Sequence, residues 1–272
     1  MKGVPALASG GLKTFVFDLD GVIWVDRNGL PGAGPALTAL RAAGHQILFA
    51  SNNSARALAT VYANIERRTG YVPDPDSVIT SALAATRLVS KTGATCYVLG
   101  SQPLSDALAA AGVTVTDDHT AATAVVVGLD RDLSYERLTR AVLAVRAGAD
   151  FYATNDDATY PMPNGQYPGA GAMVAAVERS SGRRAIVCGK PHEPIRDLVE
   201  SRVERDDVWV VGDRPETDLA LAASAGWGKI LTLTGVTDTP AGLPAHLRPD
   251  VTIGSIAELP DLVRTTADGS GG

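Results

Sequence analysis

Long apolar runs and clusters of basic residues are both missing from this chain. No apolar run in its 272 residues approaches the ~18 residues needed to span a bilayer. The formal net charge is −6, and no run of Lys or Arg is longer than Arg183-Arg184. Such a composition suits neither the backbone of a nucleic acid nor an anionic membrane surface. We therefore expect no nucleic acid and no membrane among the partners, and we expect a small molecule instead.

Cysteine and histidine are also scarce. The two cysteines, Cys96 and Cys188, each lie in an apolar strand-like run, which predicts reduced core residues rather than a disulfide. The four histidines are scattered without the spacing of metal ligands, so we assign none of them a ligand role. The residues before Phe15 lack the apolar core of a secretory signal, and the expected location is the cytoplasm.

What the chain does contain is an acidic pair directly after an apolar run. Residues 14–17 favour a buried parallel strand, and Asp18 and Asp20 follow it before Gly21 breaks the pattern. In open α/β sheets, ligands bind outside the carboxyl ends of the strands. The pair is therefore predicted to hold a cation and to act on a substrate.

Strand and helix patterns alternate along most of the chain, which is typical of a parallel sheet with crossover helices. After the first strand, further strands are expected at 46–50, 96–99, 124–127, 185–188, 208–211, 230–233 and 251–253. Asn28-Gly29 predicts a hairpin turn in a small flap. Residues 154–171 are rich in turn residues and predict a substrate-selecting loop, and residues 265–272 predict a frayed tail.

Four of the predicted strands end in polar residues that suit phosphoryl transfer. These residues are Asp18 with Asp20, Ser51 with Asn52, Lys190, and Asp213 with Asp218. If the four strands are neighbours in one parallel sheet, all four groups converge on one crevice. Two carboxylates plus a substrate phosphate suit Mg²⁺, and Lys190 would neutralise the anion. Ser51 and the amides near Asn52 would hold phosphate oxygens.

The chemistry assigns different roles to the two members of the acidic pair. Asp18 is expected to attack phosphorus and form an aspartyl-phosphate, while Asp20 protonates the leaving group and then deprotonates the hydrolytic water. Each polar residue by itself also has a structural explanation as a turn or cap residue. The interpretation as a site therefore depends on the whole set.

These stretches, in this order, resemble the four motifs of haloacid-dehalogenase-superfamily phosphatases. The matching segments are Asp18-Leu19-Asp20-Gly21-Val22, Ser51-Asn52-Asn53-Ser54, Gly189-Lys190-Pro191 and Gly212-Asp213-Arg214-Pro215-Glu216-Thr217-Asp218. Within the superfamily, Thr154-Asn155-x-Asp157 and Pro168-Gly169-Ala170-Gly171 are similar to the NagD-like, p-nitrophenyl-phosphatase branch. The likeness extends from Thr14 to about Leu262.

The resemblance implies an α/β fold, with a Rossmann-like parallel-sheet core and a large inserted α/β cap domain of the C2 type. The core would comprise residues 1–79 and 185–272, and the cap residues 80–184. It also implies that Asp18 is the nucleophile and a Mg²⁺ ligand and that Asp20 is the acid/base, binding the metal through its backbone carbonyl. Asp213 would be the remaining protein ligand, and Asp218 would support the metal waters. The residues expected to contact phosphate or substrate are Ser51, Asn52, Asn53, Lys190, Asn155, Asp157 and Tyr160.

The predicted function is Mg²⁺-dependent hydrolysis of a small phosphomonoester. Glycerol phosphate, phosphoglycolate, a nucleotide, a sugar phosphate and p-nitrophenyl phosphate all fit the shared core, and a homodimer through the cap is also expected. Tyr160 stands where some pyridoxal-phosphate-specific relatives have a His, which argues against that substrate. Pro215 replaces a commonly aliphatic residue, but proline suits the first turn of a helix.

Two alternative functions remain open at this point. A haloacid dehalogenase would use the same nucleophile on a carbon centre, but it would leave Asp20 and Asp213 unexplained. A non-catalytic, receiver-like phosphate-sensing module also gathers Asp and Lys at strand ends. It would place its phosphoacceptor Asp at the strand end where Ser51 stands.

Overall fold

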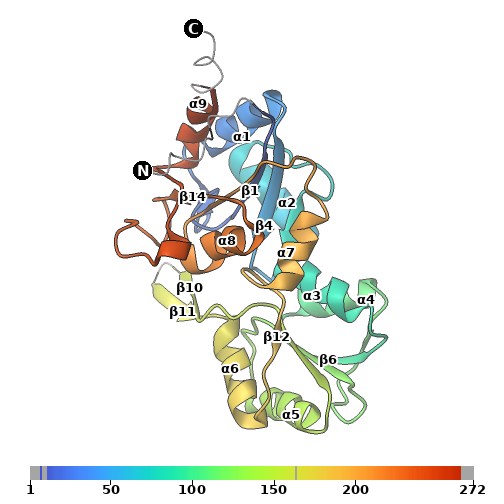
Figure 1. Cartoon of the computed structure of the whole chain (residues 1–272). Helices are drawn as coiled ribbons and strands as arrows, with labels where there is room; N and C mark the ends of the chain where they lie inside the picture. Colours follow the sequence, from blue (N-terminus) through green and yellow to red (C-terminus); the bar gives the residue numbers. More distant parts are fainter. Residues whose placement is uncertain (1–6, 8–10, 163, 265–272) are drawn as a thin grey trace. The chain divides into compact units, whose positions relative to one another are not determined.

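The computed structural model describes residues 7, 11–162 and 164–264, and the expected tail lies outside these described residues. The chain divides into two compact units (Figure 1). The first unit takes its described residues from 1–51, 61–79 and 199–272, and the second comprises 52–60 and 80–198. Among the described residues, no helix has the length and apolar character needed to cross a membrane.

The first unit is built on a six-stranded sheet with the order β15-β14-β13-β1-β4-β5. Its strands are β1 (Thr14–Phe17), β4 (Gln46–Ser51), β5 (Val78–Thr80), β13 (Val208–Gly212), β14 (Gly228–Thr232) and β15 (Val251–Ile253). β1 pairs in parallel with β13 on one side and β4 on the other. All four residues of β1 are buried, as expected for an apolar run in a parallel sheet that is covered on both faces.

Helices pack around this sheet (Figure 1), and those at residues 33–42, 58–69 and 259–264 contribute side chains to its hydrophobic cluster. They are α1 (Ala33–Ala42), most of α2 (Leu58–Thr69), the end of α7 (Glu193–Glu200), α8 (Ala220–Ala225) and α9 (Leu259–Arg264). α1 buries Ala33, Ala36, Leu37 and Leu40, which is the spacing of one face of a helix. These side chains share one hydrophobic cluster with the aromatic residues of β1 and β4.

A small hairpin follows β1, as predicted, but its turn is displaced from the expected position. β2 (Trp24–Val25) pairs antiparallel with β3 (Asn28–Gly29), so Asn28-Gly29 is the second strand and not the turn. The turn is made by Asp26 and Arg27, and Asp26 has φ of 53°. Aspartate tolerates this left-handed conformation better than most residues do, so it can replace the expected Asn-Gly.

The second unit contains a five-stranded parallel sheet with the order β12-β9-β8-β6-β7. Its strands are β6 (Thr95–Leu99), β7 (Thr114–Val115), β8 (Ala124–Val127), β9 (Asp150–Ala153) and β12 (Ile186–Val187). Its helices are α3 (Ser81–Val89), α4 (Gln102–Ala110), α5 (Tyr135–Arg146) and α6 (Ala170–Ser181). Residues from β6, β8, β9, α5 and α6 form a second hydrophobic cluster, which confirms the predicted second α/β unit.

Two expectations about this region are wrong. Residues 185–188 were expected in the core, where sharing one sheet with β1 would bring the four strand ends together, but β12 pairs with β9 in the second sheet. Residues 154–171 are not a continuous loop, because β10 (Thr159–Met162) and β11 (Gly165–Pro168) form an antiparallel hairpin and α6 begins at Ala170. Proline is unusual inside strands, so Pro161 and Pro168 concealed this two-stranded hairpin in the sequence.

The limits of the two units also differ from the expected division of the chain in two stretches. Residues 52–60 and 185–198 belong to the second unit, although the sequence analysis placed both with the core. Asn52 and Lys190 therefore lie in the unit that holds Asn155 and Asp157. The role of the second unit as a cap over a catalytic core stays a prediction.

Candidate active site

Three aspartates of the first unit gather at one edge of its sheet. Each of Asp18, Asp213 and Asp218 offers a carboxylate oxygen within 4.8 Å of those of the other two. Asp218 and Asp213 are 0% and 1% exposed, and Asp18 is 9% exposed. Among the described residues this is the one group of three or more acidic, cysteine or histidine side chains arranged to hold a metal ion.

The register of the sheet brings these aspartates together. Phe17 of β1 is paired with Val211 of β13, and the ladder continues through a 2.9 Å hydrogen bond from Asp18 N to Val211 O. Asp213 directly follows β13 and therefore lies at the same edge as Asp18. Because β13 and β1 run parallel, the sequence prediction that their ends share an edge is confirmed.

Asp218 reaches the group from a short π-helix, Pro215–Leu219, and not from an ordinary first helical turn. Arg214 N donates a 3.1 Å hydrogen bond to Asp218 Oδ2, and Asp218 N donates one of 2.8 Å to Arg214 O. These reciprocal bonds hold the carboxylate at the start of the helix. Pro215 is the first residue of this turn, where its missing N–H costs nothing.

Glycines leave the space that the aspartates occupy. A Cβ atom on Gly21 or Gly235 would collide with the carboxylate of Asp213, and one on Gly212 would collide with the side chain of Asp218. Gly21 has φ of 87°, a conformation that side-chain-bearing residues rarely adopt. Gly21 was expected from the sequence as the end of the strand pattern, whereas Gly235 was not. The sole sequence signal for Gly235 is its position just beyond the strand at 230–233.

Asp20 lies apart from the three-carboxylate group and is partly exposed. Its Oδ1 accepts a 2.7 Å hydrogen bond from Trp24 Nε1, and Gly21 N donates one of 2.7 Å to Trp24 O. Thr234 Oγ1 donates a 2.6 Å hydrogen bond to Gly21 O. The Asp20 carboxylate is therefore engaged by the hairpin and is not a member of the three-carboxylate group.

Two further polar groups lie at the same edge of the sheet. Ser51 ends β4, beside β1, and is 3% exposed. Val236 N donates a 2.7 Å hydrogen bond to Asp213 Oδ2, which makes the segment after β14 part of the site. The sequence analysis predicted Ser51 and missed Val236, because a main-chain donor leaves no mark in the side-chain pattern.

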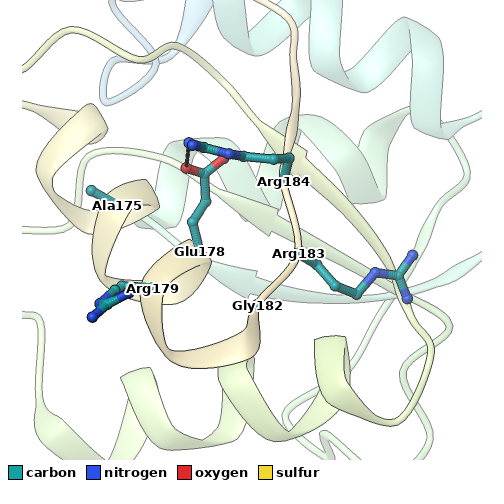
Figure 2. A pocket seen from close by; sticks show the side chains of 6 residues that line it. All are labelled: Ala175, Glu178, Arg179, Gly182, Arg183 and Arg184. Atoms are coloured by element: carbon teal, nitrogen blue, oxygen red, sulfur yellow. Dashed lines mark hydrogen bonds and ion pairs between the residues drawn. The ribbon is translucent and has the colours of Figure 1, made fainter.

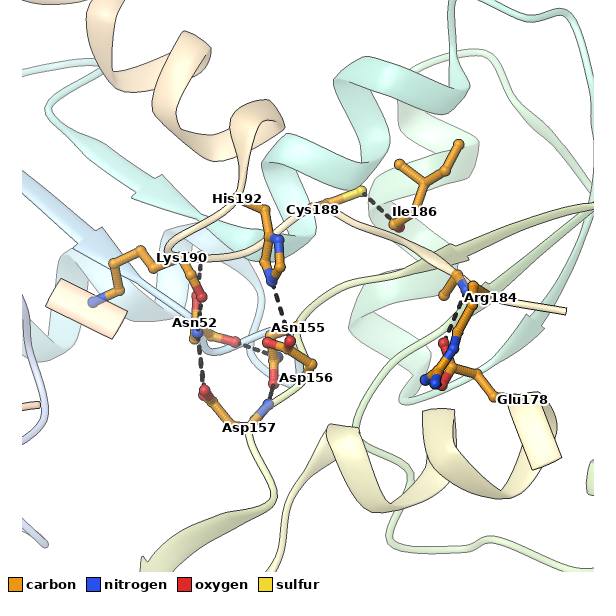
Figure 3. Close-up of polar contacts among 11 residues, drawn as sticks. Asn52, Asn155, Asp156, Asp157, Glu178, Arg184, Ile186, Cys188, Lys190 and His192 are labelled. Atoms are coloured by element: carbon orange, nitrogen blue, oxygen red, sulfur yellow. Dashed lines mark hydrogen bonds and ion pairs between the residues drawn. The ribbon is translucent and has the colours of Figure 1, made fainter. Parts of the chain in front are cut away.

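Four more of the predicted residues, Asn52, Asn155, Asp157 and Lys190, form a hydrogen-bonded cluster inside the second unit (Figure 3). Asn52 Nδ2 lies 3.1 and 3.2 Å from the two carboxylate oxygens of Asp157 and 3.1 Å from Lys190 O. Lys190 N donates a 2.7 Å hydrogen bond to Asn52 Oδ1. Asn155 Nδ2 donates one of 2.7 Å to Asn52 O, and its side chain is buried. Lys190 itself is 2% exposed.

Other polar and aromatic residues of the second unit make contacts of their own. His192 Nε2 lies 3.1 Å from Asp156 Oδ2, and hydrogen bonding to His192 lowers the pKa of the Asp156 carboxyl below its ordinary value. Asn53 Oδ1 accepts a 3.0 Å hydrogen bond from Ala55 N. Tyr160 packs edge-on against Tyr167, and the Arg131 guanidinium lies 5.5 Å from the Tyr160 ring centroid. The substrate contacts predicted for these residues stay predictions.

A surface cavity of about 330 Å³ lies elsewhere in the second unit (Figure 2). It is lined by Ala175, Glu178, Arg179, Gly182, Arg183 and Arg184 around the end of α6. Arg184 Nη1 pairs with Glu178 Oε2 at 2.6 Å, while Arg179 and Arg183 extend in different directions in Figure 2. None of the predicted site residues lines this cavity.

Both cysteines are buried free thiols, as the sequence predicted. Burial raises the pKa of Cys96 to about 12 and that of Cys188 to about 12. A thiol with so high a pKa carries almost no thiolate near neutral pH, and the thiolate is the nucleophilic form. Neither thiol therefore supplies a nucleophile near neutral pH.

The three-aspartate group fits a divalent cation. Three carboxylates within 4.8 Å of one another repel, and burial increases the energetic cost of their charge. A bound cation offsets both effects, and carboxylate oxygens are the ligands that Mg²⁺ and Ca²⁺ prefer. The donor set thus favours a hard divalent metal over zinc, which takes nitrogen and sulfur ligands.

Comparisons with known proteins agree with this geometry. Residues 15–114 match the haloacid dehalogenase-like hydrolase family, and residues 187–259 match a HAD-hydrolase-like family. The chain is 36% identical over 231 residues to an acid sugar phosphatase of Staphylococcus haemolyticus, covering 83% of this chain and 86% of that protein.

Two solved structures are similar along nearly the whole chain. A 4-nitrophenylphosphatase from Thermotoga maritima has a TM-score of 0.84 and 32% identity, covering 95% of this chain and 99% of that one. A glycerol phosphate phosphatase from Mycobacterium tuberculosis, solved in complex with magnesium, has a TM-score of 0.84 and 32% identity. This second similarity covers 93% of this chain and 77% of that one.

These relatives are phosphatases by name, and their similarity spans both units of the chain. The motif order, the carboxylate group at the ends of β1 and β13, and the inserted five-stranded unit all agree with it. The chain belongs to the haloacid dehalogenase-like hydrolases and is a phosphatase of their NagD-like, p-nitrophenyl-phosphatase branch.

Proposed function

We propose that this phosphatase hydrolyses a small phosphomonoester with Mg²⁺ as cofactor and Asp18 as nucleophile. The observation that carries the proposal is the gathering of Asp18, Asp213 and Asp218 at the end of two parallel strands. Glycerol phosphate, sugar phosphates and p-nitrophenyl phosphate are the first substrates to test. The names of the relatives support this choice, because each acts on a small phosphorylated compound.

The first half of the reaction transfers the phosphoryl group to the protein. An Asp18 carboxylate oxygen attacks phosphorus, and the bond from phosphorus to the leaving oxygen breaks as the aspartyl-phosphate forms. Asp20 gives its proton to that leaving oxygen, so the product leaves as an alcohol. The hydrogen bond from Trp24 Nε1 holds the Asp20 carboxyl in place for this transfer.

The second half regenerates the carboxylate. Asp20, now ionised, removes a proton from water, whose oxygen attacks phosphorus and releases inorganic phosphate from Asp18. Asp18, Asp213 and the main-chain carbonyl of Asp20 would hold Mg²⁺, and Asp218 would orient its waters. When bound, the cation neutralises negative charge on the phosphoryl oxygens. Lys190 is predicted to add positive charge to the same group.

Turnover of p-nitrophenyl phosphate tests the nucleophile assignment. Asp18→Asn keeps the shape of the side chain but removes the attacking carboxylate, so we expect kcat to fall by on the order of 10³ or more. The matched control is Asp106→Asn in α4, whose Oδ1 accepts a hydrogen bond from Gln102 and can do so after the change. Ordinary turnover by Asp18→Asn would disprove the assignment.

The identity of the substrate needs a separate experiment. A panel of phosphorylated metabolites with Mg²⁺, measured as released phosphate, would rank glycerol phosphate, phosphoglycolate, nucleotides and sugar phosphates by kcat/KM. We expect compact phosphomonoesters to rank highest. A protein that released chloride from a chloroacid without metal, and no phosphate from any compound, would contradict the proposed function.

A further inference from the structure

The hydrogen bonds of the Asn52 side chain account for all of its donor capacity. An Asn amide has two N–H donors on nitrogen and accepts through its oxygen. One donor of Asn52 goes to Lys190 O at 3.1 Å, and the other goes to the carboxylate of Asp157 at 3.1 and 3.2 Å. The oxygen accepts from Lys190 N at 2.7 Å. No donor is left for an oxygen of a phosphate group.

The orientation of this amide is fixed by its partners. Lys190 N is a donor and must face the amide oxygen, whereas Lys190 O is an acceptor and must face the amide nitrogen. The side chain therefore bridges both main-chain polar groups of Lys190. Gly189 permits this close approach, because a Cβ at that position would lie 2.6 Å from Asn52 Oδ1.

The main chain of Asn52 is held as firmly as its side chain. Asn52 O accepts hydrogen bonds of 2.7 Å from both Ser81 Oγ and Asn155 Nδ2. Asp157 N in turn donates a 3.2 Å hydrogen bond to Asn155 Oδ1. Asn52 is thus the junction of three segments of the second unit, namely the residues after β4, the Asn155–Asp157 segment and Lys190, as Figure 3 shows.

We propose that Asn52 is a positioning residue, which fixes the main chain of Lys190 and joins it to Asp157, and that its amide does not bind phosphate. This proposal refines the proposed function and rests on it, since Lys190 is there predicted to neutralise the phosphoryl group. The main chain of Lys190 is held at both its N–H and its carbonyl group. The point from which the lysine side chain extends is therefore fixed. An error of about 1 Å in placing such a group costs up to about a hundredfold in rate.

Exchanging the two side chains separates positioning from direct contact. Asn52→Asp removes both donors and sets two carboxylates against each other, so kcat/KM for p-nitrophenyl phosphate should fall about tenfold to a hundredfold. Adding Asp157→Asn restores a hydrogen bond of reversed polarity, from the new amide at 157 to the new carboxylate at 52. The double variant should recover about tenfold over Asn52→Asp, although the bond to Lys190 O is still lost.

The same variants distinguish the alternative, in which the Asn52 amide touches phosphate. A carboxylate at position 52 would then repel phosphate in both variants. The inhibition constant of inorganic phosphate would therefore be raised equally in both. Positioning predicts that the double variant regains most of the inhibition by inorganic phosphate. The matched control is Asn64→Asp in α2, where the 2.5 Å contact with Arg67 is retained and wild-type kinetics are expected.

Amide hydrogen exchange tests the anchoring without any substrate. In Asn52→Ala, Lys190 N loses its acceptor and should exchange at least about tenfold faster, while Thr154 N, bonded to Val127 O at 2.8 Å, keeps its rate. This readout judges the anchoring even if the wild-type protein fails as a phosphatase. The proposal would be overturned if kcat/KM did not recover in the double variant. It would also be overturned if the amide hydrogen of Lys190 exchanged at the wild-type rate in Asn52→Ala.

Discussion

At the scale of single residues, the site depends as much on missing side chains as on charged ones. Gly21 and Gly235 lie beside Asp213, and a Cβ on either would collide with its carboxylate. Such contacts explain why glycines flank the acidic residues at this edge. They also give a way to disturb the carboxylate group without changing its charge.

Gly21→Ala is predicted to weaken metal binding as well as stability. A positive φ alone costs about 1 kcal/mol for alanine, and the collision with Asp213 should add about 1–3 kcal/mol. The measurements are the free energy of unfolding and the Mg²⁺ concentration that gives half-maximal activity.

Gly70→Ala is the matched control for this substitution. Gly70 also has a positive φ, of 72°, but a Cβ there meets nothing within 4 Å. It should therefore show the backbone cost alone and keep the wild-type Mg²⁺ dependence. Equal Mg²⁺ dependence in the two variants would contradict the role given to Gly21.

Most residues of the first-unit site could be predicted from the sequence, because each follows an apolar run. Asp18, Ser51 and Asp213 belong to this class. The parallel register of β1, β4 and β13 then places them at the same edge of the sheet. The hydrogen bonds of Asn52 could not be predicted in this way. They join residues separated by more than a hundred positions, and such a pairing has no local pattern.

At the scale of elements, the starts of β1 and β4 are joined by a buried polar contact. Lys13 N, just before β1, donates a 3.1 Å hydrogen bond to Nδ1 of His45, just before β4. Lys13 Nζ pairs with Asp207 at the start of β13, so one end of all three central strands is tied together. The ring of His45 also packs edge-on against Phe15.

Acidification should loosen this end of the sheet. Burial, and then the charge of Lys13, lower the pKa of His45 below its ordinary value of 6.5. The folded state thus favours the neutral ring, and below pH 6.5 the unfolded chain binds more protons than the folded one. The His45 contribution to stability is therefore complete above pH 6.5 and is lost progressively as the pH falls towards the lower, folded pKa.

Urea unfolding above and below pH 6.5 measures this effect. The free energy of unfolding of the wild-type protein should decrease on acidification. His45→Asn supplies an amide oxygen as acceptor for Lys13 N without a titrating ring. The free energy of unfolding of this variant should therefore decrease less on acidification than that of the wild type. If both proteins lose the same amount over this interval, His45 is not the source.

Strands were predicted best where they consist mainly of apolar residues. β8 is found at the predicted residues 124–127, and β4 extends one residue beyond the predicted 46–50. β9 was missed, and with it the partner of β12, because Asp150–Ala153 begins with an exposed charge. With β9 absent from the prediction, residues 185–188 were placed in the core together with β1.

At the scale of the whole molecule, the metal should couple activity to stability. Excess chelator is expected to stop hydrolysis of p-nitrophenyl phosphate, and excess Mg²⁺ is expected to restore it. Because the carboxylates converge only in the folded chain, Mg²⁺ at about 100 times its dissociation constant should add ~2.7 kcal/mol to the stability of the first unit. That addition corresponds to a rise of several degrees in its melting temperature.

Thermal unfolding with and without Mg²⁺ checks the coupling. Asp213→Asn removes one charge from the group and should abolish most of the Mg²⁺-dependent rise. Asp250→Asn is the control, since Asp250 lies outside the group and its Oδ2 accepts a hydrogen bond from Lys229 N. Full activity in excess chelator would contradict the role of a metal.

The sequence by itself determined the fold class, the family and the residues that carry charge at the strand ends, because all of these follow from local runs and short motifs. Only the tertiary structure decided that β12 joins the second sheet and that the Asn52 amide forms hydrogen bonds with Lys190 and Asp157. The physical reason is that strand pairing and side-chain hydrogen bonds between distant residues depend on which surfaces meet, and local sequence does not encode this.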